Sequence, residues 1–382
     1  MNLVDWQPLS RLLLVAAALA LLPLGWWWWR QRQAPLNIRL TMLTALTLFL
    51  TFDLIVFGAF TRLSDSGLGC PDWPGCYGHA SPIGASQQIS QAQAAMPTGP
   101  VTHGKAWIEM IHRYLAMVVG ALILVAAGIS WWARRTLPHS AWWATLTLAW
   151  VIVQGLFGKY TVTLKLYPAV VTLHLLGGVV LLAMLVAQHE SFRQRPLPGV
   201  VRPLWVGLAL AAVFVQIALG GWVSTNYAVL ACTGFPDCNG QWWPDMAFAE
   251  GYVVLRQLGL AADGSHLNLT ALVAIHMVHR LFAIAVVLGL LALAWSLRRG
   301  GHAAGRSYAG WLLLVLLMQL VSGVSNVVLD WPLAAALAHS GGAAALVAIL
   351  VSLLARCLAS DPQASAASAY RWTTAPAAAM NP

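Results

Sequence analysis

Long apolar segments alternate with polar connections along most of this 382-residue chain. An α-helix needs about 20 predominantly apolar residues to cross the hydrocarbon core of a bilayer. Nine segments reach that length and predict transmembrane helices over residues 10–29, 38–60, 107–132, 141–160, 168–188, 203–224, 271–297, 308–329 and 333–356. The pattern therefore indicates an all-α integral membrane protein.

The composition agrees with this fold class. Hydrophobic residues make up 59% of the chain and charged residues only 9%, which excludes an ordinary soluble domain. The formal net charge of +9 is therefore interpreted through the topology of the loops. No basic run is interleaved with aromatic residues in a polar segment, so we expect no nucleic-acid partner.

The first apolar segment is predicted to be a retained membrane helix. A signal peptide is disfavoured because only Arg11 precedes the apolar run and no small-residue cleavage site follows it. The segment instead ends in four tryptophans before Arg30, and aromatic rings of this kind favour a membrane interface.

Arginines in the connections predict the orientation. They follow the first, third, fifth and seventh segments, at Arg30, Arg32, Arg39, Arg134, Arg135, Arg193, Arg195, Arg202, Arg298, Arg299 and Arg306. By the positive-inside rule this face is cytoplasmic, so loops 61–106 and 225–270 lie outside. We expect a multi-pass protein of a bacterial-type inner membrane, with residues 359–382 as a disordered cytoplasmic tail rich in Ala, Pro and Ser.

Segments two to five and six to nine form an internal repeat. His112 and His279 lie 167 positions apart, and His174 and His339 lie 165 positions apart. An even number of spans gives both halves the same orientation, related by a pseudo-two-fold axis along the membrane normal. The predicted fold is two tandem four-helix transmembrane bundles plus one extra N-terminal transmembrane helix, divided as 1–36, 37–198, 199–358 and the tail 359–382.

Four histidines are the candidate ligands of two metal centres. His112 and His279 lie at the start of the second helix of each half, and His174 and His339 lie about two turns into the last. Two imidazoles that approach one iron from opposite sides are typical of bis-histidine heme ligation in a helical bundle. Glycine pairs follow His174 and His339, at 177–178 and 341–342, where we expect a flat macrocycle to approach the backbone. Zinc is the alternative, with His276 or Glu109 as a further ligand.

Glu109 is the position at which the halves differ, because its counterpart in the repeat is His276. A carboxylate in an apolar bundle is costly and suits proton transfer or stabilisation of a cationic intermediate. The alternative is an interfacial glutamate paired with Arg113 or Lys105. Basic residues near the outer face are candidates for heme propionates or for snorkelling interface anchors: Arg62, Arg113, Lys159, Lys165 and Arg280.

Each outer loop holds two cysteines that are separated by five residues, Cys70 and Cys76 in one loop and Cys232 and Cys238 in the other. On an oxidising face we expect a local disulfide in each, Cys70–Cys76 and Cys232–Cys238, although pairing across the loops is an open alternative. A structural staple is favoured over a thiol–disulfide relay.

Taken together, these residues resemble the heme A synthase family over roughly 38–358. The resemblance rests on the stretch 58–68 (Gly-Ala-Phe-Thr-Arg-Leu-Ser-Asp-Ser-Gly-Leu), on Glu109-Met-Ile-His112 and His276-Met-Val-His279, and on His174, His339 and both cysteine loops. The family has eight helices, so the first segment here is a departure.

The resemblance implies oxidation of the C8 methyl of heme O to a formyl group, which gives heme A. His112 and His174 would flank the substrate heme O, Glu109 would be the catalytic carboxylate, and His279 and His339 would ligate a permanent heme b. A heme O synthase upstream, a cytochrome oxidase or its assembly factors downstream, and an electron-transfer partner are the implied partners.

Two other functions are alternatives to heme A synthesis. A diheme b-type cytochrome that only transfers electrons between quinol and another acceptor predicts the same histidines, but it gives no reason for Glu109. A transporter predicts polar residues at mid-membrane, whereas these candidates cluster near the outer interface.

Overall fold

The computed structural model describes residues 7–137 and 140–359, and these form helices and loops without any β-strand. The long helices in this part of the chain are α1 (Gln7–Gln31), α2 (Leu36–Leu63), α4 (His103–Trp132), α5 (Trp142–Thr163), α6 (Pro168–Arg193), α7 (Pro203–Thr225), α9 (Leu269–Arg299), α10 (Ala303–Val328) and α11 (Leu333–Leu358). Short helices α3 (Ser86–Ala95), η1 (Val229–Ala231) and α8 (Phe248–Gly251) lie in the two long loops. The predicted tail lies almost entirely outside the described residues.

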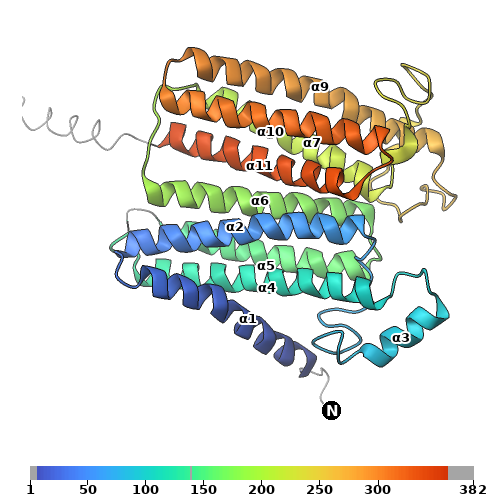
Figure 1. Ribbon diagram of the computed structural model, residues 1–382, viewed down its shortest axis with the longest axis horizontal. Helices are drawn as coiled ribbons and strands as arrows, with labels where there is room; N and C mark the ends of the chain where they lie inside the picture. Colours follow the sequence, from blue (N-terminus) through green and yellow to red (C-terminus); the bar gives the residue numbers. More distant parts are fainter. Residues whose placement is uncertain (1–6, 138–139, 360–382) are drawn as a thin grey trace, which may run out of the picture.

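The long helices run side by side, and both long loops emerge at the same end (Figure 1). Helices α2, α4, α5 and α6 pack in one group, and α7, α9, α10 and α11 pack in another. The groups meet where α2 and α6 contact α11 and where α6 contacts α7. Helix α1 packs on α4 and α2 at the edge of the assembly (Figure 1).

Eight helices in the described part of the chain are long and apolar enough to cross a membrane. They confirm eight of the predicted segments, α1 included. Helix α5 fills the remaining segment, 141–160, but it is not among the eight. Its sequence carries several threonines together with Gln154 and Lys159, which lower its mean hydropathy.

Local sequence explains where the histidine-bearing helices begin. The Thr102 side chain accepts a hydrogen bond from Lys105 N at the start of α4, and Asn268 accepts one from Ala271 N at the start of α9. Proline lies at the first turn of α6 and just before α11, where its fixed φ suits a helix start. These starts place all four histidines toward the end that carries the two long loops.

Candidate functional site

The histidines of α9 and α11 face each other across the second group of helices. The ring centres of His279 and His339 lie 6.4 Å apart, and the ring planes cross at 77°. Metal–imidazole bonds are about 2 Å long, so one ion bound between two rings places their centres roughly 6 Å apart. The separation therefore fits bis-histidine ligation of a single iron.

Polar side chains from the neighbouring helices hold these two rings. Ser322 Oγ lies 3.1 Å from Nδ1 of His339, and Gln216 Nε2 lies 3.1 Å from Nδ1 of His279. A hydrogen bond at Nδ1, such as that between Ser322 and His339, orients the ring and leaves Nε2 for a metal, whereas Gln216 Nε2 also lies 3.5 Å from Nε2 of His279. Sequence reasoning missed both residues.

His112 and His174 occupy the corresponding positions in the first group, 167 and 165 residues before His279 and His339. His112 stacks on Phe57 of α2, with ring centres 6.4 Å apart and planes 11° from parallel. The Nδ1 atoms of both histidines are buried and have no hydrogen-bond partner among the described residues. Such buried polar atoms normally have a partner, so the pair fits binding of an additional group.

Each histidine faces a glycine on an adjacent helix. A Cβ built on Gly58 would lie 2.9 Å from Cε1 of His112, and one on Gly220 would lie 2.9 Å from Cε1 of His279. His174 and His339 are opposed in the same way by Gly158 and Gly323, at 3.6 and 3.2 Å. The absence of a side chain at Gly58, Gly220 and Gly323 makes room for the imidazoles, whereas a Cβ at Gly158 would make only ordinary contact. The sequence analysis did not assign this role.

Gly177, Gly341 and Gly342, which follow His174 and His339, do not have the role expected of them. A Cβ on Gly177 would lie 1.9 Å from Nε2 of Gln154, and one on Gly342 would lie 2.2 Å from Nε2 of Gln319. Gly341 packs against α2 instead. These glycines admit side chains from neighbouring helices, so they present no open face to a macrocycle.

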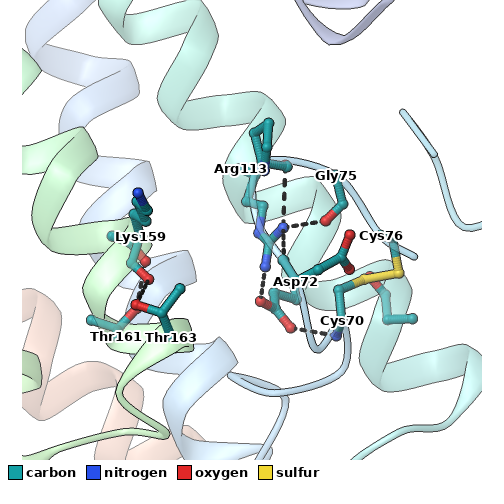
Figure 2. Close-up of polar contacts among 12 residues, drawn as sticks. Cys70, Asp72, Gly75, Cys76, Arg113, Lys159, Thr161 and Thr163 are labelled. Carbon is teal, nitrogen blue, oxygen red and sulfur yellow. Dashed lines mark hydrogen bonds and ion pairs between the residues drawn. A yellow bond between two sulfur atoms is a disulfide. The ribbon is translucent and has the colours of Figure 1, made fainter. Parts of the chain in front are cut away.

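Glu109 is 4% exposed and lies under the first cysteine loop. Its Oε2 accepts a hydrogen bond from Cys70 N at 2.8 Å, and its Oε1 is ion-paired with Arg113 one turn further along α4. Arg113 also donates to the carbonyls of Asp72, Pro74 and Gly75 (Figure 2). The pairing with Arg113 that the sequence offered as an alternative is therefore present.

In each half one arginine bonds both to loop carbonyls and to the residue one turn earlier in its helix, an arrangement called here the arginine clamp. The second half has this clamp with an imidazole in place of the carboxylate. Arg280 Nε donates to Nε2 of His276 at 3.1 Å, and Nη1 donates to the carbonyl of Asp237 at 2.9 Å. His276 is thus engaged by a guanidinium. In the described part of the chain no three His, Cys, Asp or Glu side chains converge on a metal position, so zinc lacks the ligand set it requires.

The remaining basic candidates lie elsewhere. Arg62 donates from Nη2 to the carbonyl of Ser224 at 2.7 Å and stacks over Tyr227 at 4.0 Å, so it joins α2 to the end of α7. Lys159 lies apart from the Arg113 cluster, with Nζ 5.8 Å from the ring centre of Trp73 (Figure 2).

The cysteines pair locally, as expected, in the disulfides Cys70–Cys76 and Cys232–Cys238. Asp72 fixes the first loop by accepting hydrogen bonds from the backbone N–H groups of Tyr77 and Gly78 at 2.6 and 2.7 Å. Each disulfide-closed loop thus lies over one arginine clamp.

Comparison with known proteins shows the family of the chain. A sequence profile of the family described as cytochrome oxidase assembly protein matches residues 41–351. The heme A synthase of Shewanella oneidensis is 41% identical over 325 residues, which cover 82% of this chain and 96% of that protein. The chain belongs to the heme A synthase family.

Two other heme A synthases match at lower identity. That of Shouchella clausii is 30% identical over 54% of this chain and 65% of its own length. That of Halalkalibacterium halodurans is 28% identical over 78% of this chain and 88% of its own length. The match to the family thus spans both groups of helices, with α1 before the matched residues.

Proposed function

We propose that this member of the heme A synthase family oxidises the C8 methyl group of heme O to the formyl group of heme A. The observation that supports this best is the presence of two histidine pairs at equivalent positions, one in each group of helices, with a buried carboxylate three residues before a histidine of only one pair. An enzyme with one substrate heme and one resident heme needs two such sites but only one reacting centre.

In this proposal His112 and His174 hold the iron of the substrate heme O, and Gly58 leaves room for the ring of His112. His279 and His339 hold a resident heme b, oriented through Gln216 and Ser322. Heme b supplies one-electron transfer when bound. The sequence assigns neither heme to a half, so this assignment follows the family resemblance.

Glu109 is the proposed catalytic carboxylate. Conversion of a methyl to a formyl group exchanges two hydrogens for an oxygen and removes four electrons, so positive charge develops and protons leave at that carbon. Arg113 and the Cys70 N–H hold the carboxylate in one orientation. A fixed negative charge stabilises developing positive charge without reorganisation, and the same group accepts a proton.

The proposal also covers the arrangement of the helix bundles and their orientation in the membrane. Residues 37–198 and 199–358 are tandem four-helix bundles in a pseudo-two-fold parallel repeat, preceded by an extra helix in 1–36. The cysteine loops face the periplasm of a bacterial-type inner membrane, and the C-terminus is cytoplasmic, as the arginine distribution favours. A heme O synthase supplies the substrate, and a cytochrome oxidase or its assembly factors receive the product.

Heme analysis tests the function. The protein is co-expressed with a heme O synthase and purified in mild detergent, and its extracted hemes are separated and identified by mass. Heme B together with heme O, heme A or a hydroxylated intermediate is expected. Heme B alone would contradict the synthase function and favour an electron-transfer cytochrome.

A further inference from the structure

The first bundle contains a layer of buried polar side chains far from its histidines. Thr44 and Thr47 of α2, Thr147 of α5 and Gln188 of α6 are each 3% exposed or less. These four residues, here called the polar layer, line one cavity of about 10 Å³ together with apolar side chains. Thr147 precedes Gly158, the glycine next to His174, by eleven residues, or about 16 Å of helix. Heme ligation therefore gives no reason for this layer.

The equivalent positions of the second bundle are apolar. Gly58 and Gly220 are 162 positions apart, and with this offset Thr44 corresponds to Val206. His174 and His339 are 165 positions apart, and with this offset Thr147 corresponds to Leu312 and Gln188 to Leu353. Those three residues are at most 1% exposed and belong to one continuous hydrophobic cluster. The same helix arrangement is therefore built with apolar residues at these three positions, and the fold does not require the polar layer.

The hydrogen bonds of the polar layer are incomplete. Thr47 Oγ1 donates to the Leu43 carbonyl at 2.8 Å, and Thr147 Oγ1 donates to the Trp143 carbonyl at 3.0 Å. Thr44 Oγ1 is buried without a partner among the described residues. A buried hydroxyl without a partner is costly, whereas a water with two to four polar partners satisfies it. A cavity of about 10 Å³ reaches the lower limit of the space that one water needs.

A surface hollow lies at the end of the first bundle opposite the cysteine loops. It measures about 280 Å³ and is lined in part by Asn37 of α2, Thr136 and Gln194. Asn37 precedes Thr44 by seven residues and Gln194 follows Gln188 by six, so about two turns of helix separate the hollow from the cavity on both α2 and α6.

We propose that the polar layer is an internal water-binding site, supplied from the end of the first bundle opposite the cysteine loops. Water is the ligand whose size and hydrogen-bonding capacity match the cavity and the free hydroxyl of Thr44. The site hydrates the half that contains Glu109 and leaves the other half dry. The proposal does not depend on which heme either half binds.

Reaction of introduced thiols with Ag⁺, a probe of about the size of water, tests access. Thr44→Cys and its matched control Val206→Cys are made in full-length protein that carries Cys357→Ala, because Cys357 is the cysteine outside the two disulfides. A thiol at a dry position reacts only through local opening, so we expect position 44 to react at least about tenfold faster than position 206. Equal rates would overturn the proposal, whatever hemes the protein contains.

Thermal unfolding of Thr44→Val provides a second, independent measurement. If the hydroxyl binds water, its removal lowers the unfolding midpoint by about 2 °C or more. If the layer is dry, the substitution removes an unsatisfied hydroxyl and the midpoint rises. An unchanged or raised midpoint would therefore contradict a bound water at Thr44.

Discussion

Replacing Gly220 by alanine tests whether His279 is an iron ligand. The new Cβ would lie 2.9 Å from Cε1 of His279, whereas carbon atoms in contact prefer about 3.5–4.0 Å. The ring must therefore move by about 0.6 Å or more. Without a metal, a flexible side chain moves this far at little cost. A metal-bound imidazole does not, because ligand distances at a metal site hold to within about 0.2 Å.

We expect Gly220→Ala to fold normally and to lose affinity for heme b by roughly 10- to 100-fold, the range seen when the surroundings of a metal ligand are disturbed. Gly207→Ala is the matched control on the same helix, since a Cβ there meets no atom within 4 Å. Both substitutions remove a helical glycine, so both share the same gain in helix propensity. The assay is heme B extracted per mole of folded protein, checked by the reduced-minus-oxidised spectrum.

A Gly220→Ala protein that binds as much heme b as Gly207→Ala would refute the reasoning. The imidazole of His279 would then be free to tilt, which a bond to iron does not allow. Loss of heme b from both variants would point instead to a general requirement for glycine in α7.

The remaining predictions concern both halves. Gly58→Ala should lose retained heme O and keep heme b, whereas Gly158→Ala, whose Cβ would lie at an ordinary 3.6 Å, should keep both on heme extraction. Glu109→Gln should keep both hemes and lower heme A formation by about 10²-fold or more in a turnover assay. Cys70→Ser should lower stability to unfolding by roughly 2 kcal/mol through loss of a short-loop disulfide, measured under oxidising and reducing conditions. Ser322→Ala should retain heme b but shift its midpoint potential in a redox titration.

Much of the fold follows from hydropathy, because a membrane-spanning segment must satisfy its backbone internally and must match the bilayer thickness. The ranges of the long helices, α1 included, were predicted on that basis, whereas the two local disulfides were predicted from the cysteine spacing and the oxidising face of their loops. Residues such as Gly220 and Ser322 were not identified, because their roles depend on how each helix is rotated toward its neighbour. Hydropathy carries little information about that rotation when a helix is apolar on all sides.

Glycines illustrate the same limit. Gly177 and Gly178 were assigned to a macrocycle because they follow His174, but a helix face is shared by several neighbours. In the structure Gly177 packs against the Gln154 side chain of α5. The glycines that do oppose the imidazoles, Gly58 and Gly220, lie on other helices, and the signal available in the sequence was their common offset of 162 with the cysteine pairs.

The two arginine clamps indicate what the carboxylate of Glu109 is for. Arg113 and Arg280 hold the two cysteine loops in the same way, through loop carbonyls and through the residue one turn earlier in the helix. Among the described residues Arg280 has no ion pair, yet its loop is closed in the same manner. The clamp therefore does not require a negative charge, and a neutral imidazole at position 276 suffices. A buried carboxylate is expensive to maintain, so its presence in only one half argues that its charge serves the chemistry of that half.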